Sequence, residues 1–141
     1  MIVLDTNVVS ELMQIEPDRT IVPWLDSIFP DDIYTTSITI YEIELGILTS
    51  KSERKKRELE HAFRRLRWEI FGDRRILPFE EIAALKAAQL TAHQRAAGRP
   101  IDLRDTQIAA IALVRDMPLV TRNVKHFLAS GVTIINPWDQ T

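Results

Sequence analysis

The sequence predicts an α/β protein with a mainly parallel central sheet of four to five strands and helices on both faces. Short apolar segments rich in β-branched residues alternate with helical patterns along the whole length. No internal repeat, low-complexity tract or linker interrupts this alternation. Parallel strands need crossover connections, and right-handed crossovers place helices on both faces of the sheet.

The expected strands are short, and the expected helices lie between them. Pro23 falls within the second helix and weakens that assignment, whereas Gly98 and Gly131 mark helix ends. The strands are expected at 2–5, 33–36, 75–79, 119–121 and 132–135, and the helices at 7–13, 18–29, 38–49, 52–71, 80–97, 103–115 and 123–129.

Length and composition favour a single cytoplasmic domain over residues 1–141. The chain is 45% hydrophobic and 27% charged, which is ordinary for a globular protein. It contains no cysteine, which excludes disulfides, thiolate zinc sites and a cysteine nucleophile. Met1 leads directly into the first strand without a basic leader, and no apolar run approaches the roughly 20 residues that span a bilayer.

The charge is unevenly distributed along the chain. Residues 51–75 contain ten Lys or Arg and five Asp or Glu, a net charge of +5 within an overall charge of -2. The remaining residues therefore carry -7. Two interpretations stay open: a nucleic-acid track beside an acidic metal site, or a solvated helix face with internal ion pairs.

Asp5 is the most informative residue of the chain. The stretch 2–7 reads IVLDTN, so a buried strand ends in an acid and two small polar residues. Ligands of open α/β sheets bind at the carboxyl ends of the strands. A helix N-cap would also suit Asp5, but Thr6 and Asn7 can serve as caps as well. We therefore favour Asp5 as a metal ligand.

A second candidate acid lies in the helix 38–49. This helix is apolar nearly all round, which predicts that it is buried, and a buried acid needs a partner or a metal. Glu42 and Glu44 point in nearly opposite directions, and periodicity does not decide between them. Gly46, one turn beyond Glu42, would let a backbone or a substrate approach, which favours Glu42.

A third candidate lies at the start of the helix 103–115. Asp102 follows Pro100 closely and suits the N-cap, whereas Asp105 falls in the first turn with the small Ala109 one turn further on. We favour Asp105 as the ligand and Asp102 as the cap, and the reverse assignment stays open. Oxygen ligands gathered at one sheet edge indicate a hard metal ion and phosphate chemistry.

Several neutral or basic residues lie near the same predicted strand ends and helix starts as these acids. Asn123 could cap the next helix or offer an oxygen to the site, and three hydroxyls could orient ligands: Thr6, Ser37 and Thr121. Arg122 and Lys125 are basic residues in the same segment and are candidates for contacts with a nucleic-acid backbone. His61 and His93 are expected on the surface, as is His126 despite its position near Asn123. The tryptophans, Trp24, Trp68 and Trp138, are expected in the core or an interface.

The chain resembles the PIN-domain nucleases, in particular the VapC-like toxins close to the FitB branch. The resemblance rests on IVLDTN at the start, on Glu42 four residues before Gly46, on Asp105 before Ile108-Ala109-Ala110, and on the stretch LVTRN at 119–123. It covers the whole chain and implies the three-layer PIN-like fold.

The resemblance also implies the ligands and partners. Asp5, Glu42 and Asp105 would bind Mg²⁺ or Mn²⁺ in an endoribonuclease of a type II toxin–antitoxin pair, a hydrolase that uses a metal-activated water. A homodimer and a small antitoxin that blocks the site are implied too. Many such proteins carry a fourth carboxylate at or just after the position of Asn123, where this chain has Asn123 and His126. One metal ion is therefore expected, with a second arriving only with the substrate.

Other functions remain compatible with the same pattern. An RNA-processing nuclease without a toxin role would share the site, and a non-catalytic module would bind a partner through its hydrophobic surface. A haloacid-dehalogenase-type phosphatase is disfavoured because it needs Asp-x-Asp where this chain has Asp5-Thr6-Asn7. A receiver domain is disfavoured because Lys125 is poorly placed for its lysine.

Overall fold

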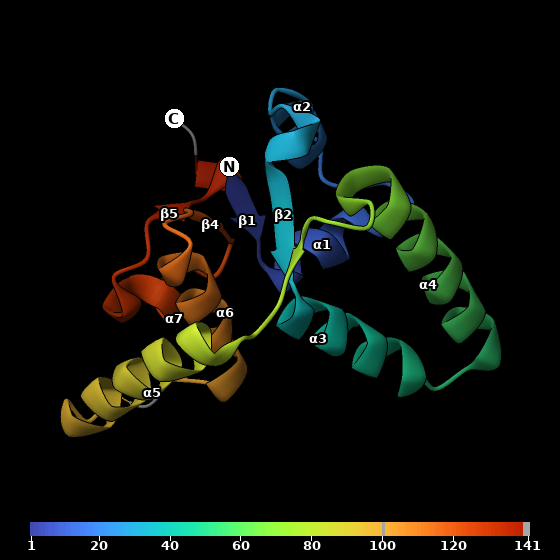
Figure 1. Ribbon diagram of the computed structural model, residues 1–141. Helices are drawn as coiled ribbons and strands as arrows, with labels where there is room; N and C mark the ends of the chain where they lie inside the picture. The colour runs from blue at the N-terminus through green and yellow to red at the C-terminus, as the bar shows by residue number, and fades with distance from the viewer. Residues whose placement is uncertain (100, 140–141) are drawn as a thin grey trace.

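A five-stranded parallel sheet forms the centre of the molecule. The computed structural model describes residues 1–99 and 101–139. The strands lie in the order β3-β2-β1-β4-β5, and every pairing is parallel, so the predicted fold class is confirmed (Figure 1). The strands are β1 Ile2–Leu4, β2 Ile33–Thr36, β3 Ile76–Leu77, β4 Leu119–Val120 and β5 Ile134–Ile135.

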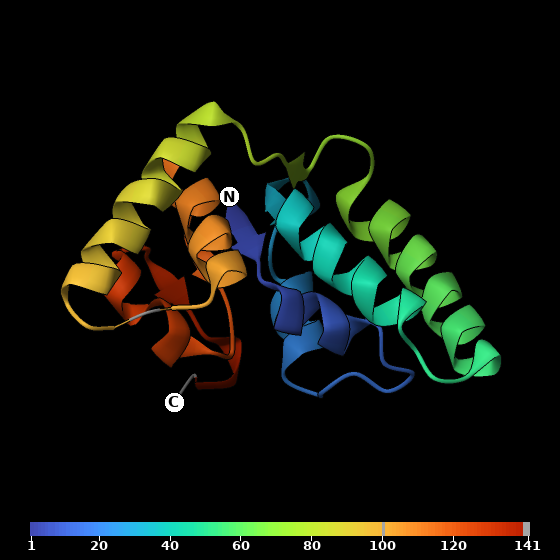
Figure 2. The ribbon, with the colours of Figure 1, turned by 90° about the horizontal axis from the view of Figure 1, so that it is seen from below.

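The helices form a layer on each side of this sheet. Figures 1 and 2 show α1, α3 and α4 together on one side and α5 and α6 on the other, with β1 between them. Across the carboxyl end of β1, α3 also contacts α6. The helices are α1 Thr6–Leu12, α2 Ile21–Asp26, α3 Ser37–Leu48, α4 Glu53–Leu66, α5 Glu81–Ala96, α6 Leu103–Val114 and α7 Val124–Phe127.

Two apolar clusters fill the space between the layers. Successive side chains of a strand point to opposite faces of a sheet. Accordingly Ile2 and Leu4 of β1 pack in one cluster, and Val3 packs in the other. Val120 and Leu119 of β4 divide in the same way. The central strands are therefore buried on both faces, as expected for parallel strands.

Several elements are shorter than predicted. The strands expected at 75–79 and 132–135 are reduced to two residues each, and the segment 18–29 is α-helical only over Ile21–Asp26. The helix expected at 52–71 changes to π-helical geometry over Arg67–Phe71 and ends at Gly72, which has a φ of 59°. Short 3-10 turns occupy Pro30–Asp32, Leu128–Ser130 and Pro137–Asp139.

The prediction that the helix 38–49 is buried all round was wrong. Only one side of α3 faces the core, through Ile43 and Ile47, while Tyr41 and Leu48 are 57% and 61% exposed. The reason is that α1 and α4 cover one flank of α3, whereas its outer flank has no layer above it among the described residues.

The basic segment has the solvated face that one interpretation predicted. Arg54 pairs with Glu58 and Arg65 with Glu69, each at (i, i+4) spacing on exposed side chains of α4 and the turn that follows. Trp68 is 67% exposed beneath the Arg67 guanidinium, whereas Trp24 and Trp138 pack against the core as expected. Across residues 1–99 and 101–139, no helix combines the length and hydropathy needed to cross a membrane.

The strand order determines where a site can form. From β1 the chain proceeds to β2 on one side, and it later returns to β4 on the other side. The crossovers next to β1 and β4 therefore diverge, and this switch point leaves a crevice beyond the carboxyl ends of the two strands. Asp5 follows β1 directly and Thr121 follows β4.

Candidate functional site

Asp5 is buried at the switch point and held by neutral donors. Its Oδ1 accepts from the backbone N of Thr6 at 2.8 Å, so Asp5 is the N-cap of α1. Thr6 and Asn7, the alternative caps that the sequence offered, therefore do not take this position. Its Oδ2 accepts from Asn7 Nδ2 and from Thr121 Oγ1, both at 2.8 Å. The residue is 3% exposed, and three donors hold its carboxylate.

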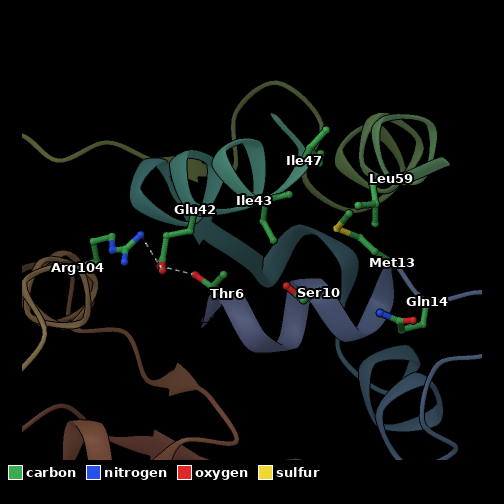
Figure 3. A pocket seen from close by; sticks show the side chains of 10 residues that line it. Thr6, Ser10, Met13, Gln14, Glu42, Ile43, Ile47, Leu59 and Arg104 are labelled. Carbon is green, nitrogen blue, oxygen red and sulfur yellow. Dashed lines mark hydrogen bonds and ion pairs between the residues drawn. The ribbon is translucent and has the colours of Figure 1, made fainter. Parts of the chain in front are cut away.

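Glu42 projects from α3 toward the same edge. Its Oε1 accepts from Thr6 Oγ1 at 2.8 Å, and its Oε2 lies 3.8 Å from Arg104 Nη1 (Figure 3). Glu44 is exposed and lies outside this edge, so Glu42 and not Glu44 faces the space at the end of the sheet. A Cβ at Gly46 would meet open space, consistent with an accessible surface one turn further along.

Asp102 and Asp105 have different positions at the start of α6, and Asp102 is the cap that the sequence predicted. Asp102 is the N-cap of α6, where its Oδ1 accepts from the backbone N of Arg104 at 2.8 Å and of Asp105 at 3.4 Å. Asp105 is free of that task, and its Oδ2 lies 3.2 Å from His126 Nδ1. His126 is exposed, as expected, yet it also contacts this acid.

The three acids line one cavity of ≈ 350 Å³, which we call the acid cavity. As placed, Asp5, Glu42 and Asp105 surround this space without converging on one point. Within residues 1–99 and 101–139, no three Asp, Glu or His side chains lie close enough to hold one ion. The residues that line the acid cavity are Asp5, Thr6, Asn7, Glu42, Asp102, Arg104, Asp105, Asn123 and His126.

The surroundings of Asp5 and Asp105 in the acid cavity disfavour the ionised form of their carboxyl groups. Burial raises the pKa of Asp5 to about 6, and the negative charges of Asp105 and Glu42 add to the rise, against the lowering effect of the hydrogen bonds from Thr121 and Thr6. The pKa of Asp105 is also raised, first by burial and then by Asp102. A bound cation would remove this repulsion, so the oxygen donor set fits a hard divalent ion.

Supporting hydroxyls are present, although one of them was assigned wrongly. Thr6 and Thr121 contact the acids as predicted. The described hydrogen bonds do not connect Ser37 with the site, because the backbone turns at Thr36, which caps α3 by accepting from Thr39 N. Thr39 takes the supporting position instead, with its Oγ1 3.1 Å from Thr6 Oγ1.

Asn7 is a functional candidate that sequence reasoning treated only as a possible cap. Its Nδ2 donates to Asp5 and also to Thr121 Oγ1 at 3.0 Å, and its Oδ1 accepts from the backbone N of Arg122 at 3.1 Å. It therefore ties the end of β1 to the segment after β4. Its position two residues after Asp5 was the available signal, since an Asx side chain reaches that far along the chain.

The residues after β4 lie beside the acid cavity. Asn123 lines the acid cavity and occupies the N-cap position of α7, but its side chain makes no capping hydrogen bond. The Arg122 guanidinium lies 4.6 Å from the centre of the Trp138 ring. Lys125 is exposed outside the residues that line the acid cavity. Their roles toward RNA remain predictions.

A second cavity of ≈ 350 Å³, which we call the side groove, adjoins the acid cavity between α1, α3 and α4 (Figure 3). The two cavities share Thr6, Glu42 and Arg104. The side groove is otherwise lined by Ser10, Met13, Gln14, Ile43, Gly46, Ile47 and Leu59. It is an amphipathic surface that ends at Glu42.

Comparison with known proteins decides the family. The PIN-domain model matches residues 2–129, which include all three candidate acids. The chain belongs to the PIN-domain family. Relatives of this PIN domain include Toxin FitB of Neisseria gonorrhoeae, which is 36% identical over 98% of this chain and 99% of its own. The VapC ribonuclease Y4jK of Sinorhizobium fredii is 36% identical over 99% of both chains.

Solved structures agree with the fold of this PIN domain. The crystal structure of FitAcB from Neisseria gonorrhoeae matches with a TM-score of 0.88 and 36% identity, covering 99% of this chain and 100% of that one. The structure of FitAB bound to an IR36 DNA fragment matches with a TM-score of 0.87, covering 100% of this chain and 98% of that one. The resemblance stated from the sequence is thereby confirmed.

The first prediction concerns the stability of this PIN domain as a function of pH. Because the pKa of Asp5 is about 6 in the folded state and 3.8 as its reference value, the folded state binds more protons between these values. The free energy of unfolding should therefore fall as pH rises from about 4 to about 6, by about 3 kcal/mol from Asp5. Asp5→Asn should remove this part of the fall in urea unfolding with a chelator present.

Glu44→Gln is the matched control, because Glu44 is an exposed acid that lies outside the acid cavity. It should keep the wild-type pH profile. If the free energy of unfolding depended on pH in the same way for wild type and Asp5→Asn, the assignment of this pH dependence to Asp5 would be contradicted.

The second prediction separates the cap from the candidate ligand. Asp102→Ala should lower the free energy of unfolding by about 1 kcal/mol, because two backbone N–H groups of α6 lose their acceptor. Asp105→Ala should not lower it, because that substitution removes a carboxylate whose ionisation burial disfavours. Thermal and urea unfolding at pH 7 measure both, and a larger loss from Asp105→Ala would reverse the two roles.

Proposed function

We propose that this PIN domain is a metal-dependent endoribonuclease and the toxin of a type II toxin–antitoxin pair. The observation that carries the proposal is the acid cavity: acids from three distant segments line one space at the carboxyl edge of the sheet. PIN-domain ribonucleases generally depend on divalent metals, and this chain supplies oxygen donors of the kind that such ions prefer. The family match and the single sheet support one nuclease domain over 1–141.

The names of the relatives support the toxin role. Proteins 36% identical over nearly the whole chain are named Toxin FitB and VapC ribonuclease. A related solved structure is described as VapBC-5 from Mycobacterium tuberculosis, a member of a toxin–antitoxin family, at 26% identity and a TM-score of 0.70. We infer from these that an antitoxin protein is the partner of this chain.

The metal of this site would be Mg²⁺ or Mn²⁺, held by Asp5, Glu42 and Asp105. Three ionised carboxylates carry about -3, enough to neutralise one divalent ion, and a second ion would accompany the substrate phosphate. For the three acids to share one ion, Glu42 would turn from Arg104 and Asp105 from His126. When bound, the ion would activate water and stabilise charge on the scissile phosphate.

Hydrogen bonds from neighbouring residues of this PIN domain position Asp5 and Glu42 in the proposed site. Asn7 and Thr121 hold Asp5 from one side and the Thr6 N–H holds it from the other, so the carboxylate keeps one orientation. Thr6 Oγ1 directs Glu42 toward the acid cavity. Asn123 and His126 occupy the remaining wall and offer an amide and an imidazole where many relatives would place an acid. Lys125 and Arg122 would contact the RNA backbone nearby.

The exposed outer side of α3 supports the proposal of a homodimer. Tyr41, Leu45 and Leu48 are exposed there, and Leu103 of α6 is 65% exposed. Pairing of two such surfaces would remove large apolar side chains from water.

The third prediction tests the activity. Asp5→Asn, Glu42→Gln and Asp105→Asn should each reduce Mn²⁺- or Mg²⁺-dependent cleavage of single-stranded RNA by about 100-fold or more, because each removes one negative ligand. The measurement uses the purified, antitoxin-free chain, with EDTA abolishing activity. Glu44→Gln should cleave like the wild type, since it lies on the same helix but outside the acid cavity.

Growth of a bacterial host tests the toxin role separately. Expression of the wild-type chain should arrest growth, and expression of Asp5→Asn should not. Full cleavage by Asp5→Asn would defeat the assignment of the site, whereas cleavage without growth arrest would leave a nuclease that is not a toxin.

A further inference from the structure

Arg104 bridges the two halves of the acid cavity. It is the second residue of α6, and its Nη1 lies 3.8 Å from Glu42 Oε2 on α3 (Figure 3). Its Nε lies 3.9 Å from Oδ1 of Asp102, the residue that caps α6. A guanidinium therefore stands between two acids that come from opposite sides of the sheet.

Arg104 carries the permanent positive charge of this space. Of the described residues that line the acid cavity, four are acids, one is Arg104 and one is a histidine. Four carboxylates around one cavity repel each other, and Arg104 offsets part of that repulsion. His126 contacts Asp105, so Glu42 depends on Arg104 for a positive neighbour.

The contacts of Arg104 are loose. Both ion-pair distances exceed the 2.7–2.9 Å or so of a charge-assisted hydrogen bond, so attraction acts through space without a fixed bond. The side chain is 41% exposed, and it borders both the acid cavity and the side groove. Such a side chain can leave Glu42 at small cost and reach a group entering from either cavity.

We propose that Arg104 is an exchangeable counter-ion of the catalytic site. In the absence of a metal it neutralises Glu42, and once a divalent cation takes Glu42 it turns to a phosphate group of the RNA. Arg104 thus competes with the metal and assists the substrate. Guanidinium suits both tasks, because it is always charged and matches carboxylate and phosphate oxygens with the same pair of N–H groups. This inference rests on the proposed function.

The proposal predicts opposite effects of one substitution on two affinities. Arg104→Gln should bind Mn²⁺ alone about threefold to tenfold more tightly than the wild type, measured by isothermal titration calorimetry of the full chain, because a competing charge is lost. The same variant should show a KM for single-stranded RNA raised about tenfold at saturating Mn²⁺, with a smaller change in kcat, because a phosphate contact is lost.

Two further variants make the test specific. Arg115→Gln removes the same charge from an exposed position at the other end of α6, and it should leave both values near those of the wild type. Arg104→Lys keeps the charge but loses the paired donors. It should restore the wild-type Mn²⁺ affinity and recover KM only in part.

The outcomes separate this inference from the function on which it rests. Tighter Mn²⁺ binding together with a higher KM in Arg104→Gln supports the proposal. Unchanged or weaker Mn²⁺ binding, or an unchanged KM, overturns it while the nuclease assignment stands. A wild-type chain that binds no Mn²⁺ and cleaves no RNA overturns both.

Discussion

The hydrogen-bonded carboxylate of Asp5, at the end of β1, holds the site together. Asp5 leaves the sheet where the crossovers diverge, and its carboxylate accepts from Thr6 N and Asn7 Nδ2 of α1 and from Thr121 Oγ1 beyond β4. One buried group therefore joins two strands whose sequence positions differ by more than a hundred residues. Without these donors a carboxylate at 3% exposure would be costly to ionise. With them it is oriented, although its pKa is still raised.

The order of the elements and the capping role of Asp102 could be predicted from the sequence, because both depend on local rules. The alternation of strands and helices predicts the parallel sheet. The proximity of Asp102 to Pro100 indicated that Asp102, and not Asp105, is the N-cap of the helix. Glu42 was preferred through Gly46, a signal one turn away on the same helix. Each of these inferences uses residues that neighbour each other in the chain, so sequence spacing sufficed.

The parts that could not be predicted depend on contacts between distant segments. The exposed flank of α3 follows from which helices cover it, and no periodicity within α3 reveals that. Thr39 was not among the predicted supporting hydroxyls, because the exact end of β2 decides which hydroxyl turns toward Thr6. The pairing of Arg104 with Glu42 joins residues 62 positions apart, although Asp102 and Asp105 lie much closer to Arg104 along the chain.

The three acids differ in the neighbours that stabilise them, and this difference indicates an order of events at the site. Glu42 has Arg104 beside it and Asp105 has His126, so each already has a basic partner. Asp5 has only neutral donors and is the most buried of the three. In the proposed metal site, a cation would therefore gain most from approaching Asp5 first, because the described contacts of that carboxylate are all with neutral donors. Glu42 and Asp105 would join afterwards by exchanging their partners, and Asp5 would stay in place while the other two move.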